Sequence, residues 1–155
     1  MVRGEKNRCV FCAAYEGPND EESLVVYRGK TCFVLMNRFP YNSGHLMIIP
    51  VRHTNDFQSL TPEESIESFD LLKISERALV ELSHPQGFNL GMNLGRVAGA
   101  GIDGHLHWHI VPRWNGDTNF LPVLADVKIV SEDMGEQWKR LRELFPRIIA
   151  EAAYR

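Results

Sequence analysis

The sequence predicts an α+β domain in which helices cover an antiparallel sheet. Short apolar runs separated by turn residues come first, a long amphipathic segment follows, and strand-like alternation returns before a last helical segment. The 155 residues are 44% hydrophobic, enough for a core that needs no disulfide scaffold. We therefore expect one domain over residues 1–155.

The N-terminal half predicts a turn-rich acidic linker at 16–22 (EGPNDEE), three strands and one long helix. Thr61-Pro62-Glu63-Glu64 supplies an N-cap, a proline at the first helical position and the glutamate of a capping box. The helix should run from 61 to 83 and stop at His84-Pro85. The strands, which resemble an antiparallel meander, are expected at Leu24–Tyr27, Thr31–Met36 and Leu46–Ile49.

The C-terminal half predicts further strands around a glycine-rich loop at 95–104. A terminal helix is expected over Glu132–Phe145, with Pro146 kinking or ending it. The strands are expected at Phe88–Leu94, His105–Val111 and Val127–Val130.

Charge and hydropathy exclude several classes of protein. A net charge of −3 lacks the clustered positive charge typical of nucleic-acid binding. No run of 18 apolar residues predicts a membrane span, and the polar N-terminus does not resemble a signal peptide, so we expect a cytoplasmic protein. Residues 23–55 nevertheless carry +4 and residues 82–116 carry +1, which favours anions along those stretches.

Cys9 and Cys12 form a close C-x-x-C pair, and Cys32 stands apart in an apolar run. In a reducing compartment such a pair indicates metal binding or redox chemistry before it indicates a structural disulfide. Cys32 is expected in the core.

Residues 104–113 (GHLHWHIVPR) carry the strongest chemical signal. Side chains of a strand alternate between its faces, so His105, His107 and His109 share one side and the apolar residues between them share the other. A lone histidine is usually structural, but three aligned imidazoles cost too much desolvation for an ordinary core. The motif therefore predicts a catalytic or metal site.

Strand spacing argues against one metal ion held by all three histidines. The first and third positions lie roughly 13 Å apart, whereas a zinc–nitrogen bond is only about 2 Å long. At least one imidazole is therefore free for another task. The middle residue, His107, is well placed as a nucleophile whose tautomer and charge are set by its neighbours.

With these motifs the sequence resembles the histidine triad (HIT) family, in which H-x-H-x-H is followed by an apolar pair, here Ile110-Val111. The resemblance spans nearly the whole chain and is strongest to the bacterial branch related to diadenosine tetraphosphate phosphorylases, also called ATP adenylyltransferases. It implies a HIT-like fold with a five-stranded antiparallel meander sheet, one long helix and a C-terminal helix. The segments that carry it are NRFPYNSGHLMIIPVRH, GMNLGRVAGAGIDGHLHWHIVPRW and GDTNF.

The resemblance implies an enzyme that cleaves dinucleoside polyphosphates through a covalent nucleotidyl-histidine. His107 would attack the α-phosphorus, His109 would contact phosphate oxygens, and His105 would help to fix the site. Water or phosphate would then release the nucleotide, and no residue decides between hydrolysis and phosphorolysis. The nucleotide-binding residues that the resemblance implies are His109, Asn37, Asn93, Gly99 and Gly101.

The resemblance also implies structural zinc on Cys9, Cys12, His53 and His105, a Cys₂His₂ set suited to tetrahedral coordination. Mg²⁺ would enter, if at all, with the nucleotide substrate. By resemblance we also expect a homodimer, with Trp108 serving packing or the dimer interface because it faces away from His107.

Two other functions stay open at the level of sequence. The chain could be a nucleotide-binding regulatory module with incidental hydrolysis of nucleoside phosphoramidates or related nucleotides. It could also be a metallohydrolase that uses a zinc-bound water. Tight binding without turnover would indicate the module, and activity lost on chelation without a trapped nucleotidyl-protein would indicate the metallohydrolase.

Overall fold

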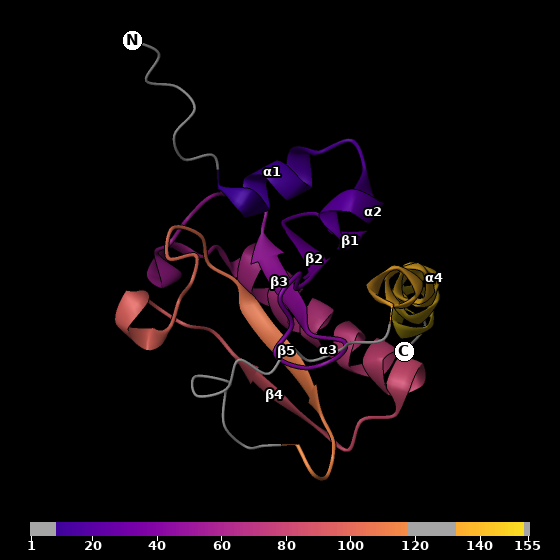
Figure 1. The fold of residues 1–155 in the computed structure, drawn as a ribbon. Helices are drawn as coiled ribbons and strands as arrows, with labels where there is room; N and C mark the ends of the chain where they lie inside the picture. Colours follow the sequence, from indigo (N-terminus) through magenta and orange to yellow (C-terminus); the bar gives the residue numbers. More distant parts are fainter. Residues whose placement is uncertain (1–8, 118–132, 154–155) are drawn as a thin grey trace.

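The computed structural model describes residues 9–117 and 133–153. Five strands form one antiparallel sheet in the order β1-β2-β3-β5-β4, which confirms the expected fold class (Figure 1). Strands β1 to β3 pair in sequence order, whereas β5 inserts between β3 and β4. The bounds are β1 Val25–Arg28, β2 Cys32–Met36, β3 Leu46–Pro50, β4 Gly87–Gly91 and β5 Trp108–Arg113.

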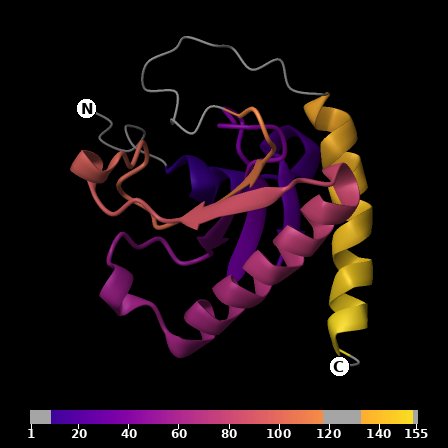
Figure 2. The same cartoon turned by 90° about the horizontal axis from the view of Figure 1, so that it is seen from below.

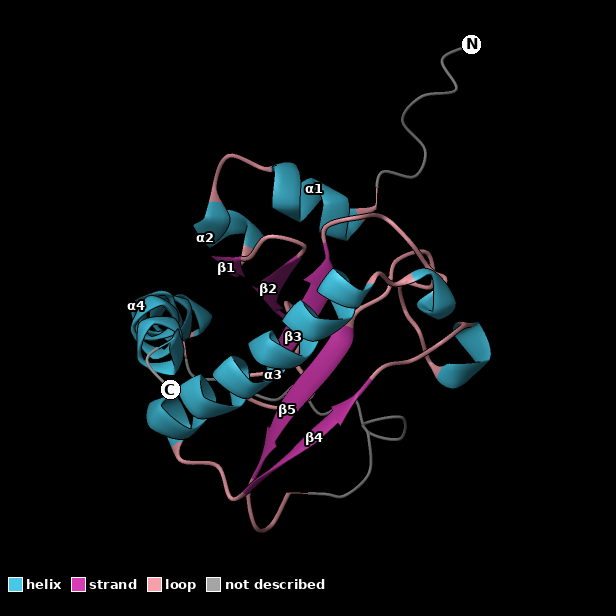
Figure 3. Ribbon diagram, turned by 180° about the vertical axis from the view of Figure 1, so that it is seen from behind, coloured by secondary structure: helices cyan, strands magenta, loops and turns pink. Residues whose placement is uncertain are grey.

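Two long helices, α3 (Pro62–Ser83) and α4 (Met134–Ala153), cover one face of this sheet (Figures 2 and 3). The predicted capping box is present, because Thr61 Oγ1 accepts from the Glu64 amide and the Glu64 carboxylate accepts from the Thr61 amide. Alternate strand residues, including Val34 and Ile48, pack under the helices. Because β2 and β3 are buried on both faces, the other face must be covered as well.

The N-terminal segment covers that other face, and its helices were missed from the sequence. The structure has α1 (Val10–Glu16), a segment with no helix prediction, and α2 (Asp20–Ser23), which lies in the segment expected to be a linker. Asn19 caps α2 and acidic residues fill its first turn, a signal that could have been used. Phe11 of α1 is buried with Phe33 and Met47 in a second apolar cluster.

The histidine-bearing strand is shorter than predicted. It begins at Trp108, so His105 and His107 precede it rather than lying within it. The Leu106 amide donates to the Thr54 carbonyl at 2.8 Å, outside the sheet ladder. The predicted alternation holds from Trp108 onward, since Trp108 and Ile110 pack on the α3 side. The short turns are η1 (Phe57–Ser59) and η2 (Arg96–Ala98).

Pro146 does not end α4, which continues to Ala153, so the expected end at Phe145 was wrong. The ring lies on the exposed side of the helix, and the hydrogen bond it removes is lost there. Leu141, Phe145 and Ile148, each at most 1% exposed, hold both sides of the proline against the core. The strand expected at 127–130 lies outside the described residues.

The two edge strands of the sheet, β1 and β4, differ in the contacts that their backbones make. At β1, Trp138 Nε1 donates to the Val25 carbonyl at 2.9 Å and Arg142 Nη1 donates to the Val26 carbonyl at 3.3 Å, so α4 satisfies edge groups. Strand β4 pairs with β5 alone among the described residues, and Leu90 on it is 54% exposed. In general, a sheet edge without a further strand is where another chain can pair.

Glu67 of α3 fastens the β1–β2 turn. Its carboxylate accepts from the Lys30, Thr31 and Cys32 amides and from the Thr31 hydroxyl, the last at 2.6 Å. Burial alone would raise the pKa of Glu67, but these hydrogen bonds together outweigh it and lower the pKa. The ionised carboxylate is therefore the form that holds the turn.

We expect Glu67→Gln to lower the free energy of unfolding by about 2 kcal/mol. The glutamine side chain has one oxygen that accepts hydrogen bonds, whereas its NH₂ group only donates, so it cannot replace both carboxylate oxygens. Urea unfolding at pH 7 measures the change. Glu76→Gln, on the exposed side of the same helix, is the control and should change stability by less than about 0.5 kcal/mol. Equal losses in the two variants would contradict this role.

No helix among residues 9–117 and 133–153 combines the length and the apolar character needed to cross a membrane.

Candidate active site

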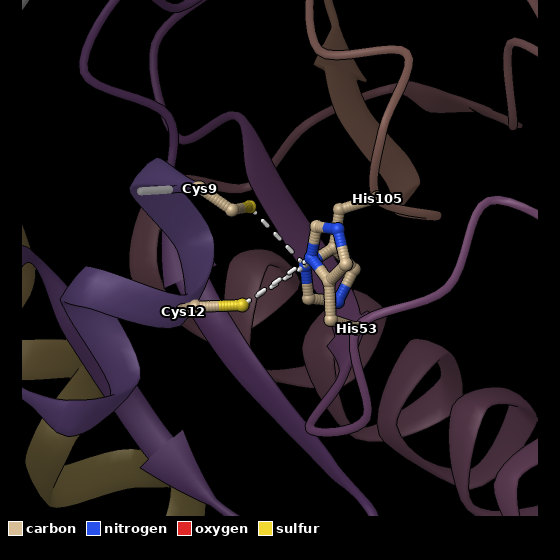
Figure 4. Close-up of side chains that lie close together, drawn as sticks. All are labelled: Cys9, Cys12, His53 and His105. Atoms are coloured by element: carbon tan, nitrogen blue, oxygen red, sulfur yellow. Dashed lines mark hydrogen bonds between the residues drawn. The ribbon is translucent and has the colours of Figure 1, made fainter. Parts of the chain in front are cut away.

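Four side chains from three distant segments converge next to α1. Cys9 and Cys12 come from the start of the chain, His53 follows β3, and His105 precedes β5, and their ligand atoms all lie within 4.8 Å of one another (Figure 4). Cys9 Sγ lies 3.4 Å from His105 Nδ1, and Cys12 Sγ lies 3.4 Å from His53 Nδ1 and 3.6 Å from His105 Nδ1. The two Nδ1 atoms are 3.3 Å apart.

These separations suit a tetrahedral zinc ion. With Zn–S near 2.3 Å and Zn–N near 2.0 Å, tetrahedral angles place sulfur and nitrogen roughly 3.5 Å apart and two nitrogens roughly 3.3 Å apart. Two thiolates would neutralise the ion, so no net charge would be buried. The four residues predicted from the sequence are thus brought together, and the four separations given above are compatible with a Cys₂His₂ site.

The surroundings orient the two imidazoles of this cluster. His105 Nε2 donates to the Pro50 carbonyl at 2.8 Å, which leaves the Nδ1 lone pair facing the thiols. The loop that carries His53 is tied down by its neighbour Arg52, whose guanidinium bonds both oxygens of the buried Glu64 carboxylate, at 3.0 and 2.8 Å. The same glutamate caps α3, so the start of the helix and the ligand loop share one anchor.

His107 lies next to the cluster but is not part of it. Its Nδ1 lies 2.9 Å from the His105 carbonyl oxygen, and since a carbonyl only accepts, Nδ1 must carry the proton. The lone pair of the neutral ring is therefore on Nε2, which has no hydrogen-bond partner among the described residues. Among the described residues, Ser75 Oγ is the only fully buried side-chain nitrogen or oxygen that lacks a hydrogen-bond partner. Because His107 Nε2 also lacks a partner, it is not fully buried and keeps contact with solvent.

The tautomer of His109 is fixed through His45. The Tyr41 amide donates to His45 Nδ1 at 3.1 Å, and Asn37 Nδ2 lies 3.2 Å from the same atom, so the His45 proton sits on Nε2. That Nε2–H donates to His109 Nδ1 at 2.9 Å. His109 must then carry its own proton on Nε2, and its ring centroid lies 4.8 Å from that of His107. The unprotonated Nε2 of His107 and the protonated Nε2 of His109 thus belong to neighbouring rings.

Burial keeps these rings neutral. It lowers the pKa of His107 and lowers the pKa of His109 to about 4, with the neighbouring His107 adding to the second shift. Burial lowers the pKa of His45 to about 3, and His109 and His107 add to this. Imidazoles that stay neutral near pH 7 can serve as nucleophiles and as hydrogen-bond donors at once.

The buried His45 predicts a loss of stability in acid. Because its pKa falls from 6.5 in the unfolded chain to about 3 in the folded one, its stabilisation is complete above pH 6.5 and is lost as the pH falls toward 3. Between pH 7.5 and 5.0 this amounts to about 2 kcal/mol. Urea unfolding at both pH values should show a drop in wild type that is about 2 kcal/mol larger than in His45→Gln. Identical drops would refute this source of acid sensitivity.

The residues expected to bind nucleotide lie in two places. Asn37 contacts His45 and also accepts from the Phe39 amide at 3.0 Å, which places it beside the histidines. Asn93 instead donates to the Gly99 carbonyl at 3.3 Å and closes the glycine-rich loop upon itself. Gly99 has a φ of 88°, a conformation that favours glycine, and Gly101 is exposed.

Most of the arginines counted in the two positively charged stretches form ion pairs within the fold. Arg28 pairs with Asp20, Arg52 with Glu64, Arg96 with Asp103 and Arg113 with Asp117. These four guanidinium groups are therefore already paired with carboxylates within the chain.

Two contributors to the site were missed from the sequence. Phe11 lies between the cysteines, and its ring centroid lies 4.9 Å from that of His107. Tyr41 fixes the His45 tautomer through its backbone and packs on His109, with ring centroids 5.7 Å apart. Neither residue type carries a chemical signal in the sequence, although the position of Phe11 inside C-x-x-C could have drawn attention to it.

Comparisons with known proteins identify relatives of this chain. An "AP-4-A phosphorylase" of Mycobacterium tuberculosis is 43% identical over 114 residues, which are 74% of this chain and 58% of that protein, so this chain matches less than two thirds of that relative's length. An uncharacterized HIT-like protein of Methanocaldococcus jannaschii is 30% identical over 134 residues, covering 86% of this chain and 98% of that protein.

Among solved structures, a zinc-bound histidine triad family protein from Mycobacterium smegmatis superposes with a TM-score of 0.71 at 28% identity, covering 92% of this chain and 96% of that one. The profile of the HIT domain matches residues 19–116. This chain therefore belongs to the HIT family.

Proposed function

We propose that this protein cleaves dinucleoside polyphosphates such as diadenosine tetraphosphate by transferring a nucleotidyl group through His107. The observation that carries the proposal is the pair of fixed tautomers, with a lone pair on His107 Nε2 and an N–H on His109 Nε2. The resemblance of the chain to an "AP-4-A phosphorylase" supports the choice of substrate class.

The chemistry follows from the hydrogen bonds of the two rings. The His107 Nε2 lone pair attacks the α-phosphorus, the P–O bond to the polyphosphate leaving group breaks, and an N–P bond forms. The ring becomes cationic while Nδ1–H still points at the His105 carbonyl oxygen, whose partial negative charge stabilises the cation. His109 Nε2–H donates to oxygens of the phosphoryl group. Phosphate or water then attacks the same phosphorus and the N–P bond breaks.

We propose that zinc occupies the cluster of Cys9, Cys12, His53 and His105 in a structural role. Four protein ligands leave no open position for a water, which favours the histidine nucleophile over a zinc-bound hydroxide. The similarity to a zinc-bound family member supports this metal. Mg²⁺, when present, would be carried by the substrate phosphates, because the cluster offers thiols that this hard cation avoids.

Product analysis with diadenosine tetraphosphate tests the function. Attack at the α-phosphorus releases ATP and leaves AMP on His107, so phosphate should yield ADP and water should yield AMP. ADP formed only with added phosphate indicates a phosphorylase, and AMP formed without phosphate indicates a hydrolase. The absence of both products together with tight binding of the nucleotide would reject the enzyme in favour of a regulatory module.

We propose a homodimer formed through β4 and the neighbouring surface of α3. Ile66, Phe69 and Leu90 are 64%, 54% and 54% exposed, and β4 is the last strand of the sheet on its side among residues 9–117 and 133–153. Light scattering should give twice the 17.7 kDa of one chain, and Leu90→Glu should give the monomer mass. Val97→Glu, at a fully exposed position in η2, is the control and should stay dimeric. A monomeric wild type would reject the interface.

A further inference from the structure

Phe11 connects the metal-binding cluster to the proposed nucleophile. It lies between Cys9 and Cys12 and is 2% exposed. Its ring meets His107 at a centroid distance of 4.9 Å and His105 at 5.7 Å, the latter edge-on at 82°. One side chain of the C-x-x-C segment thus touches both a proposed metal ligand and the proposed nucleophile.

The nucleophile needs such a contact, because polar groups can hold only one end of its ring. The hydrogen bond from Nδ1 to the His105 carbonyl fixes that nitrogen but leaves the ring free to tilt. Nε2 must stay unbonded in order to attack phosphorus. An aromatic hydrocarbon side chain can pack against the imidazole ring without forming a hydrogen bond to the Nε2 lone pair. Phe11 supplies this contact, and His109 supplies another at 4.8 Å.

Phe11 in turn depends on the segment that carries it. Helix α1 has seven residues and no side-chain cap at its start, too short to be stable by itself. A metal bound by Cys9 and Cys12 would fix the chain two residues before and one residue after Phe11. Removal of the metal would leave the burial of Phe11 and weak sulfur–nitrogen contacts to hold that turn, with no bond that fixes both cysteines.

We propose that Phe11 is a positioning residue for His107, held in place by metal-bound Cys9 and Cys12, so that metal binding sets the orientation of a nucleophile that the metal does not touch. The catalytic part of this inference rests on the proposed function of His107. The positional part concerns only the ring of His107 and can be observed without substrate.

The test compares Phe11→Leu with Phe33→Leu. Phe33 is fully buried in the same apolar cluster and packs against Tyr15 with ring centroids 5.0 Å apart, so its replacement reproduces the loss of packing. Long-range ¹H–¹⁵N NMR should show one His107 tautomer, with the proton on Nδ1, in zinc-loaded wild type and in Phe33→Leu. Phe11→Leu with a full complement of zinc, and zinc-free wild type, should both show averaging between tautomers or a broadened Nδ1–H signal.

Single-turnover kinetics with diadenosine tetraphosphate should show adenylylation slowed at least about tenfold in Phe11→Leu relative to Phe33→Leu, with KM nearly unchanged. An ordered His107 ring in Phe11→Leu, or equal disorder in the two variants, would overturn the proposal. If wild type forms no adenylyl-protein, the proposed function fails, while the NMR comparison still decides the role of Phe11.

Discussion

His107→Asn is expected to lose turnover of diadenosine tetraphosphate by about 10³-fold or more, since it removes the atom that forms the covalent intermediate. The asparagine has no unprotonated ring nitrogen at the position of Nε2, so the remaining donors can bind substrate without starting the reaction. Initial rates and acid-quenched trapping of radiolabelled nucleotidyl-protein measure the loss. Zinc content and the urea midpoint should stay close to wild type, because His107 is not one of the four cluster residues.

The control for this variant is His84→Asn. His84 is exposed and ends α3 with a φ of 49°, a left-handed conformation that asparagine tolerates. It should retain wild-type turnover. Retained turnover or a trapped intermediate in His107→Asn would show that another group is the nucleophile.

Cys12→Ser is expected to lose the metal and a large part of the stability. Wild type purified without a metal-affinity tag should contain one zinc ion per chain. The variant should contain less than about 0.2 zinc ions per chain, a fifth of the occupancy of the single site. If the free metal stands near a thousandfold above Kd, its loss removes about 4 kcal/mol of stabilisation. For a chain of this size that corresponds to a fall in Tm of roughly 10 °C.

Cys32→Ala separates the loss of metal from the loss of a cysteine. Cys32 is fully buried under α3, where burial raises the pKa of its thiol, so it stays protonated and is no metal ligand. The variant should keep one zinc while losing some packing. Wild type with less than 0.2 zinc, or Cys12→Ser with a full complement, would reject the proposed zinc site.

Short-range chemistry explains which parts of the fold were predicted. The capping box at Thr61 and the long helix behind it are encoded within a few residues, and the structure confirms them. Helix α1 is different, because its seven residues are stabilised by burial of Phe11 against distant strands. The continuation of α4 past Pro146 likewise depends on the core contact of Ile148, which local sequence cannot show.

The candidate site likewise combines features that local sequence predicts with features that depend on distant parts of the chain. Spacing within the triad predicted that at least one histidine is free for another task, and the C-x-x-C spacing indicated a metal or redox pair. The resemblance then joined Cys9 and Cys12 to His53 and His105. The geometry places those three with His105 in one cluster. Sequence could not show the direction of each imidazole proton, because the groups that fix it, such as the Pro50 carbonyl and the Tyr41 amide, belong to the backbone.

This reliance on main-chain partners limits what a side-chain scan can detect. Replacing Pro50 or Tyr41 with most residues would leave the carbonyl or the amide in place, so alanine scanning would score both positions by their packing alone. Tyr41→Pro, in contrast, deletes the N–H that holds His45 Nδ1 unprotonated. Three chemically identical side chains in one motif can thus diverge in role through the main chain around them, with the histidines themselves unchanged.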